Sequence, residues 1–387
     1  MNSIIERYIV FERTMNMGFI PVNEPLLDGN EKKYLIDCVE TGWISSAGEY
    51  VNRLEKDMAA YVGRKAGISV CNGSAALEAA VNALSIPVGS EVIMPAFTII
   101  SCSNAIIKAG LTPVLVDADY NTWNMDVSQI EEKITDKTKA IMVVHIYGLP
   151  VDMAPVIEIA QKHNLYIIED AAEAIGVTYK GKQCGSFGDI SCMSFFANKH
   201  VTTGEGGMIF ADDDAIIAKA RNEKNLYFDS ERRYIHEEIG SNFRMTNIQA
   251  AIGCAQLEKI NDHLKIKRSI GEKYNELLAE NEVFNLPVDK TEYADNLYWI
   301  YGLVIKDEIE LDATTVMKKL GEMGIGTRHF FYPIHLQPAY NKMGLFIGES
   351  YPVAEKLAQK GLYIPAGMAL TDEQIKTVAD CVNAIKA

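Results

Sequence analysis

The chain contains the stretch Ser194-Phe195-Phe196-Ala197-Asn198-Lys199-His200-Val201-Thr202-Thr203-Gly204-Glu205-Gly206-Gly207. It places one lysine, Lys199, after an apolar, strand-like run and before a glycine-rich turn, and Phe195 and Phe196 indicate that the approach to this lysine is packed. Burying an ammonium group without a partner is costly, so a desolvated lysine loses its proton more readily. The neutral amine is a nucleophile that forms a Schiff base with a carbonyl compound. A surface lysine beside a hairpin turn is the alternative that this stretch alone leaves open.

Length and composition indicate a soluble globular protein with more than one folding unit. The chain has 387 residues, more than a single hydrophobic core usually serves, which predicts two domains or a large and a small lobe. Hydrophobic residues make up 48% and charged residues 23%, which is ordinary for a soluble protein. The net charge of −15 argues against a nucleic-acid-binding surface and against adsorption to a membrane. A local cationic pocket for an anionic small substrate remains compatible with that charge.

The cysteines and the N-terminus predict a cytoplasmic protein. The seven cysteines are scattered and odd in number, with no CxxC pair and no zinc spacing, so neither a disulfide framework nor a metal site is expected. No apolar run approaches the roughly 18 residues of a spanning helix. Residues 1–19 lack the apolar core of a signal peptide and are expected to be an N-terminal extension.

A glycine turn between a strand and a helix suggests a phosphate site. A strand over 68–71 runs into Asn72, and Gly73, Ser74 and Ala75 then open an alanine-rich helix that reaches residue 84. Free backbone N–H groups and the helix dipole make such an end a binding site for phosphate. Ser74 is also an ordinary N-cap residue, and capping alone explains it.

Strands and helices alternate from residue 88 onward. Strands are expected at 91–94, 114–116, 140–144 and 165–169, and helices at 98–109, 126–134 and 153–163. Two helices, at 25–42 and about 49–62, are expected before this region, and a strand at 328–332 after it. Apolar runs of this length between amphipathic helices predict a mostly parallel sheet covered on both faces. Ligands of such sheets bind beyond the carboxyl ends of the strands. Those ends carry Phe97, His145, Tyr147, Asp170 and Glu173.

Together these residues meet the requirements of pyridoxal 5'-phosphate. Lys199 supplies the amine, and Asp170 is placed to face the ring nitrogen and keep it protonated. Phe97 would stack on the ring, while the turn 73–75 and Ser194 would hold the phosphate. Each residue has a structural alternative when taken singly. Joint coincidence of four independent requirements in one α/β sheet is much harder to accept.

At this point the chain resembles the nucleotide-sugar aminotransferases of the DegT/DnrJ/EryC1/StrS family. The motifs that carry the resemblance, in chain order, are Asn72-Gly73-Ser74, Pro95-Ala96-Phe97-Thr98, His145-Ile146-Tyr147-Gly148, Glu169-Asp170-Ala171-Ala172-Glu173-Ala174, the stretch 194–207 and Ser241-Asn242-Phe243-Arg244-Met245-Thr246-Asn247. The resemblance implies the aspartate-aminotransferase fold (pyridoxal-phosphate fold type I) and a homodimer with active sites at the subunit interface. It also implies that Asn242 reaches the cofactor phosphate of the partner subunit and that Glu173 lies near the cofactor ring.

Two departures from the family pattern concern the lysine. Relatives commonly have Gly and Thr where this chain has Ala197 and His200. Related dehydratases carry His in place of the Schiff-base lysine, whereas Lys199 is present here, which disfavours a dehydratase. The loop 225–236 also differs from close relatives, and this makes the substrate less secure than the reaction class.

The C-terminal part is expected to form a second unit. We place a large cofactor-binding domain at 20–264 and a small α/β domain at 265–387. Arg328 and His329 from the small domain, together with His145 and Tyr147, are the expected substrate contacts. Solvated polar residues on a strand are the alternative for Arg328 and His329, and a satisfied buried histidine is the alternative for His145.

The predicted function is amination of a nucleotide-linked 4-keto-6-deoxysugar, with L-glutamate as donor and 2-oxoglutarate as by-product. Lys199 would first bind the cofactor and, once released, shuttle the proton of the transamination. A 3-aminotransferase or a dehydratase is the alternative among enzymes. A non-catalytic sensor that binds pyridoxal phosphate is the alternative outside them.

Overall fold

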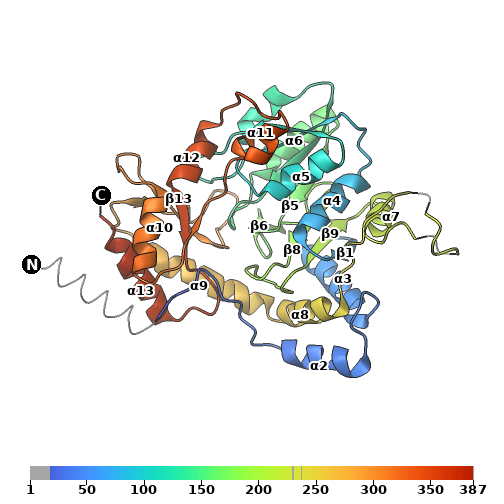
Figure 1. Cartoon of the computed structure of the whole chain (residues 1–387), viewed down its shortest axis with the longest axis horizontal. Helices are drawn as coiled ribbons and strands as arrows, with labels where there is room; N and C mark the ends of the chain where they lie inside the picture. The colour runs from blue at the N-terminus through green and yellow to red at the C-terminus, as the bar shows by residue number, and fades with distance from the viewer. Residues whose placement is uncertain (1–17, 229–230, 237, 387) are drawn as a thin grey trace, which may run out of the picture.

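The computed structural model describes residues 18–228, 231–236 and 238–386, which form two large sheets, one two-stranded hairpin and the helices around them (Figure 1). Most of the predicted extension 1–19 lies outside the described residues. Over the described part of the chain, no helix is long and apolar enough to cross a membrane.

The larger sheet has seven strands. In chain order they are β1 (Ala66–Val70), β2 (Glu91–Pro95), β3 (Thr112–Val116), β4 (Thr138–Val144), β5 (Tyr166–Asp170), β8 (Ile190–Ser194) and β9 (Gly207–Ala211). Their spatial order is β1-β9-β8-β5-β4-β2-β3, and β9 runs antiparallel to both of its neighbours while the remaining pairs are parallel. The predicted mixed, mostly parallel sheet is confirmed.

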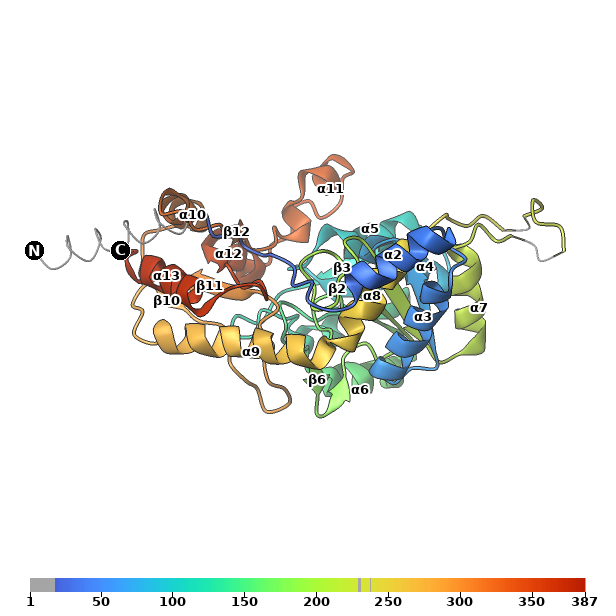
Figure 2. The same cartoon turned by 90° about the horizontal axis from the view of Figure 1, so that it is seen from below.

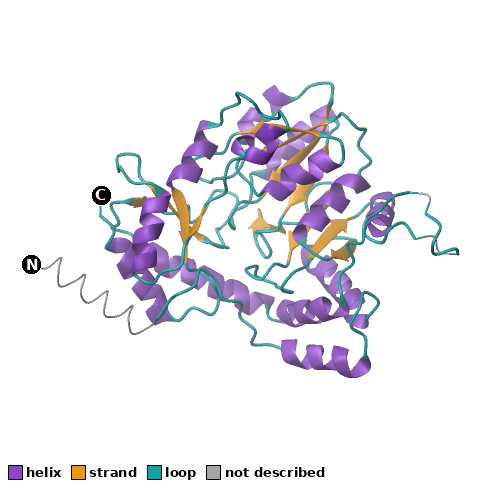
Figure 3. Ribbon diagram, viewed as in Figure 1, coloured by secondary structure: helices purple, strands orange, loops and turns teal. Residues whose placement is uncertain are grey.

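Helices cover both faces of this sheet because its strands are apolar on both sides (Figure 3). One face packs against α4 (Gly73–Ala83), α5 (Ile100–Lys108) and α7 (Asp214–Glu223). The other packs against α3 (Glu49–Val62), α6 (Met153–His163) and α8 (Asn247–Glu258). Successive side chains of β5 point to opposite faces of the sheet. Ile168 packs on the face covered by α4 and α5, and Ile167 packs on the face covered by α6.

Two predicted helices differ from the structure. The first, expected over 25–42, is α2 (Glu31–Thr41), because Asp28, Gly29 and Asn30 form the turn before it and Gly42 ends it at a φ of +74°. The segment 126–134 forms two short 3-10 turns, η1 (Val127–Gln129) and η2 (Glu131–Lys133), instead of one α-helix. The hairpin β6 (Thr178–Tyr179) and β7 (Lys182–Gln183) follows β5.

The second sheet is antiparallel and has the order β10-β11-β13-β12. Its strands are β10 (Phe284–Asn285), β11 (Tyr301–Ile305), β12 (Arg328–His329) and β13 (Gly361–Ile364). The strand expected over 328–332 is thus limited to two residues. Around it lie α9 (Ile260–Leu277), α10 (Ala313–Glu322), η3 (Ile334–Leu336), α11 (Pro338–Lys342), α12 (Pro352–Lys360) and α13 (Asp372–Asn383).

The long helix α9 connects the two sheets and runs along the base of the molecule (Figure 2). The predicted domain boundary at residue 264 falls inside this helix, and the division itself stays a prediction. The chain start also reaches the second unit, because Ile20 forms a bridge with Ile325 and is buried in the core of the small sheet.

Candidate active site

A cavity of about 470 Å³ lies beyond the carboxyl ends of β5 and β8. Residues from both units line it. Those that matter below are Gly73, Ser74, Ile99, Ser101, Asp170, Glu173, Cys192, Ser194, Lys199, Trp299, Phe331 and Tyr363. The structure therefore brings together Lys199, Asp170, Glu173 and the predicted phosphate turn, although Lys199 follows that turn by more than a hundred residues of chain.

Lys199 lies in the turn between β8 and β9, and its side chain is almost fully buried. Its Nζ lies 3.5 Å from the centre of the Trp299 ring and 3.8 Å from Oε1 of Glu173. Desolvation lowers the pKa of Lys199, against the opposing charges of Glu173 and Asp170. A lysine with a lowered pKa yields the neutral amine at a lower pH, which is what a nucleophile at this position requires.

Asp170 ends strand β5 and turns one edge of its carboxylate to the cavity. Its Oδ1 accepts from the Ala172 backbone N–H at 3.0 Å, and the Cys102 Sγ donates to Oδ2 at 3.3 Å. Burial raises the pKa of Asp170, while these two donors and Lys199 oppose the shift. Asp170 also lines the cavity, where its carboxylate has acceptor capacity left for a protonated ring nitrogen.

Glu173 lies beside Lys199 and is also buried. Its Oε2 accepts from the backbone N–H of Tyr147 at 2.9 Å, which leaves Oε1 toward the lysine. Desolvation raises the pKa of Glu173 to about 7, and the charge of Lys199 opposes this rise. A carboxyl with such a pKa exchanges a proton near neutral pH.

The turn 73–75 provides two free donors. Helix α4 starts at Gly73, and the Asn72 side chain accepts from the N–H of Ala75. No acceptor among the described residues takes the N–H groups of Gly73 and Ser74. A Cβ at Gly73 would lie 2.9 Å from that of Ser194, so only glycine lets the helix start approach β8 this closely. The Ser74 hydroxyl meets that of Ser101 at 2.7 Å, a contact that the sequence did not reveal.

Phe97 does not reach the cavity. Its ring is completely buried and packs edge-on against Tyr147 and Phe331. Two residues further on, Ile99 lines the cavity with 40% of its surface exposed. An aromatic ring suits stacking on the cofactor, but the Phe97 ring packs into the core, and the side chain that lines the cavity here is the aliphatic Ile99.

The predicted substrate residues His145 and Tyr147 are both buried behind the cavity. Tyr147 adopts a positive φ of 56°, and its hydroxyl accepts from the backbone N–H of Phe331 at 3.0 Å, which ties the end of β4 to the small unit. His145 is fully buried and contacts Glu169. Neither residue lines the cavity in this structure.

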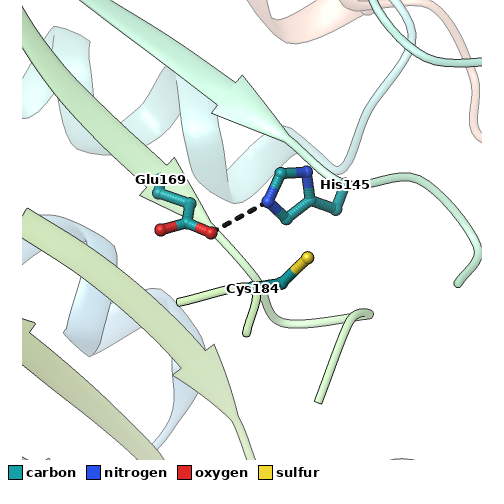
Figure 4. Close-up of side chains that lie close together, drawn as sticks. All are labelled: His145, Glu169 and Cys184. Carbon is teal, nitrogen blue, oxygen red and sulfur yellow. Dashed lines mark hydrogen bonds and ion pairs between the residues drawn. The ribbon is translucent and has the colours of Figure 1, made fainter. Parts of the chain in front are cut away.

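His145, Glu169 and Cys184 have their potential ligand atoms within 4.8 Å of one another (Figure 4). The Nδ1 of His145 accepts from the Val151 N–H at 3.1 Å, so the proton is on Nε2, which donates to Glu169 at 2.9 Å. The two oxygens of Glu169 also accept from the backbone N–H groups at 185 and 187. These lone pairs are already used within the protein, so the cluster reads as a structural support and not as a metal site.

The remaining predicted residues lie apart from the cavity wall. The Oδ1 of Asn242 accepts from Nε of Arg244 at 2.8 Å, and Asn242 forms a bridge with Asn225. Arg328 and His329 are exposed on β12 at the edge of the small sheet. In contrast, Trp299, Phe331 and Tyr363 line the cavity, although no spacing in the sequence distinguished them from core aromatics.

The residues of this cavity fit pyridoxal phosphate. The buried amine, the carboxylate with lone pairs toward the cavity and the free N–H groups at the start of α4 match its aldehyde, ring nitrogen and phosphate. The glycine at 73 lets the start of α4 lie against Ser194, so that the free N–H groups and the Ser194 hydroxyl line the same cavity.

Comparison with known proteins agrees with this fit. The model of the DegT/DnrJ/EryC1/StrS aminotransferase family matches residues 25–383. The chain is 42% identical over 368 residues to GDP-perosamine synthase of Caulobacter vibrioides, covering 95% of this chain and 98% of that one. It is 41% identical over 367 residues to GDP-perosamine synthase of Escherichia coli O157:H7, with coverage of 95% and 98%. The solved aminotransferase from Psychrobacter cryohalolentis matches with a TM-score of 0.88 and 29% identity, covering 94% of this chain and 98% of that one.

The fold, the cavity and these relatives define a pyridoxal-phosphate-dependent sugar aminotransferase with the fold type I architecture. The chain belongs to the DegT/DnrJ/EryC1/StrS aminotransferase family. Segments 20–25 and 328–335 look most like GDP-perosamine synthase within this family, in agreement with the two relatives above.

Proposed function

We propose that this enzyme transfers the amino group of L-glutamate to C4 of a nucleotide-linked 4-keto-6-deoxysugar. GDP is the proposed nucleotide, because the relatives above are named GDP-perosamine synthase. Identity of about 40% across nearly the whole of both chains is the observation that carries this proposal. The cavity supports it, because it is large enough for a sugar beside the cofactor and is walled by Trp299, Phe331 and Tyr363.

Bound pyridoxal phosphate supplies the aldehyde that accepts amino groups and a ring that takes up electron density. Lys199 would hold the cofactor through its amine and would carry the proton that leaves the donor's α-carbon. Asp170 would keep the ring nitrogen protonated. Glu173, which lies beside Lys199, would support the ring, and its pKa of about 7 would let it exchange a proton near neutral pH. Gly73, Ser74 and Ser194 would hold the phosphate.

A homodimer completes the proposal, with Asn242 donating to the cofactor phosphate of the partner subunit. Arg244 supports this role, because a guanidinium only donates and so fixes the Asn242 amide with its N–H groups outward. Exposed apolar side chains on and beside α2 offer a surface for the partner. They are Leu27, Ile36, Val39, Trp43 and Ile44.

Two further features remain proposals. We place the large cofactor-binding domain at 20–264 and the small domain at 265–387, joined by α9. A reducing cytoplasm suits the seven cysteines, all of which are free.

The test uses the purified enzyme with L-glutamate and a panel of nucleotide sugars. The panel varies the nucleotide (GDP, UDP or dTDP) and the position of the ketone (C3 or C4), and mass spectrometry follows amine formation. We expect the GDP-linked 4-ketosugar to gain nitrogen at the highest rate. Amination of the 3-ketosugar, or loss of a hydroxyl without gain of nitrogen, would replace the proposal by a 3-aminotransferase or a dehydratase.

A further inference from the structure

The carboxylate of Asp170 has a partner on the side away from the cavity. Cys102, on the first turn of α5, places its Sγ 3.3 Å from Oδ2 of Asp170. Cys102 is completely buried and is not among the residues that line the cavity. It therefore contacts the aspartate from the protein interior, while the cavity side of the same carboxylate stays open.

The direction of this hydrogen bond follows from the surroundings of the thiol. Desolvation and the nearby Asp170 charge raise the pKa of Cys102 well above its usual value. The sulfur therefore keeps its proton and can donate it, and a carboxylate can only accept. The hydroxyl of Thr98, one turn earlier, lies 3.6 Å from the same sulfur and is free to donate to it. The result is a buried chain from hydroxyl to thiol to carboxylate.

A second cysteine shows that proximity alone does not produce this contact. Cys192 is as buried as Cys102 and stands beside Asp170 as its partner across β5 and β8. The charge of Asp170 raises its pKa as well, after desolvation. Yet among the described cysteines, only Cys102 donates a hydrogen bond to this carboxylate.

We propose that Cys102 is a positioning residue, whose thiol fixes the orientation of the Asp170 carboxylate and favours its ionised form opposite the cofactor ring nitrogen. The proposal rests on the role proposed above for Asp170. With Oδ1 held by the Ala172 N–H and Oδ2 by the thiol, rotation of the carboxylate would break both bonds. A hydrogen bond to a charged acceptor is stronger than one between neutral groups, so even a weak thiol donor contributes here.

The first test measures the S–H stretching band by infrared difference spectroscopy of the cofactor-free protein. Subtracting the spectrum of Cys102→Ala isolates the Cys102 band, and subtracting that of Cys184→Ala isolates a matched reference thiol. Cys184 is equally buried but donates no hydrogen bond to a described residue. We expect the Cys102 band at lower frequency than the Cys184 band, and a rise in that frequency in the Asp170→Asn protein. A Cys102 band that coincides with the reference, or does not move in Asp170→Asn, would overturn the proposal.

The second test measures the dissociation constant of pyridoxal phosphate. We expect Cys102→Ala to weaken binding about fivefold, because one hydrogen bond to a charged group is lost, and Cys102→Ser to stay within about twofold of the wild type. Cys184→Ala is the control and should bind as the wild type does. Equal affinity of Cys102→Ala and the wild type would contradict the role. If Cys102→Ala does not fold, the spectrum of Cys102→Ser is subtracted instead to isolate the Cys102 S–H band. The frequency shift of that band in Asp170→Asn then tests the proposal.

Both measurements are independent of the sugar substrate. A failure of the substrate panel would leave the infrared shift and the cofactor affinity unchanged, and a failure here would leave the amination of the 4-ketosugar intact.

Discussion

Glu169 and Asp170 are neighbours on β5, both buried and both acidic, yet they serve opposite faces of the sheet. Glu169 accepts from the His145 ring and from the backbone N–H groups at 185 and 187. Among the described residues, Asp170 accepts hydrogen bonds from Ala172 and Cys102 only, and unlike Glu169 it lines the cavity. Burial is the same in the two cases, and the difference lies in what the protein leaves unsatisfied.

This difference distinguishes a carboxylate with a structural role from one that is available to a ligand. A buried carboxylate that accepts three hydrogen bonds away from the cavity locks the segments that donate to it, here the end of β4 and the loop after β7. A buried carboxylate with free acceptors is costly unless something else occupies them, and for Asp170 the proposed occupant is the protonated ring of the cofactor. Residue type and burial alone therefore do not assign a role.

The largest effect on activity is expected when the reactive amine of the cavity, that of Lys199, is removed. We expect Lys199→Ala to lower kcat by about 10⁴-fold or more, because both the nucleophile and the proton carrier are lost. Lys199→Arg keeps the positive charge without the nucleophile and should be equally inactive. The measurement is glutamate-dependent 2-oxoglutarate formation. Turnover by either variant near the wild-type rate would show that the cavity has been misread.

The next effect concerns the open carboxylate. Asp170→Asn keeps the shape of the side chain but removes its charge, so the ring nitrogen loses its counter-ion. We expect kcat to fall about 10²- to 10³-fold while the free energy of unfolding of the cofactor-free protein changes little. Kinetics should be normalised to bound cofactor, read from its absorbance. A variant with wild-type kcat would place the counter-ion elsewhere.

The same amide substitution at the neighbouring residue is expected to do the reverse. Glu169→Gln puts an NH₂ group where an oxygen now accepts, and we expect a loss of about 2–4 kcal/mol in the free energy of unfolding. The folded fraction should keep its kcat. Urea unfolding and kinetics at low temperature on the same preparation measure both quantities. If Glu169→Gln lowered kcat as Asp170→Asn does, without loss of stability, the two faces of β5 would not differ in role.

The sequence predicted most of the fold, because each predicted strand is a short apolar run between amphipathic helices. Helices α3 and α6 have the predicted bounds, since caps and glycines mark their ends. The prediction of one helix over 126–134 is wrong. Its polar pattern suits a helix, but Asp126 caps only a short 3-10 turn. The antiparallel course of β9 depends on long-range pairing, which no local pattern reveals.

For the site, the sequence predicts residues of an unusual type for their position. It does not predict residues whose role depends on how they pack. A lysine after a strand, or an aspartate at a strand end, is unusual enough to predict. An aromatic residue is common in cores, so neither the burial of Phe97 nor the exposure of Trp299 to the cavity could be predicted from residue type. The sequence gives no sign of a role for Cys102, because its contact with Asp170 joins residues that are 68 positions apart in the chain.

The smallest expected effect concerns a third buried carboxyl, Glu173, which extends the comparison of Glu169 and Asp170. Burial raises the pKa of Glu173 to about 7. Its ordinary pKa is 4.5, so between these values the native state binds more protons than the unfolded state, and its contribution to stability falls as the pH rises. Glu173→Gln removes this dependence. From pH 5 to pH 7.5 we expect the cofactor-free variant to gain about 2–3 kcal/mol relative to the wild type, measured by urea unfolding. A constant difference between the two proteins would mean that Glu173 is ionised throughout this range, and Glu173 would then exchange no proton near neutral pH.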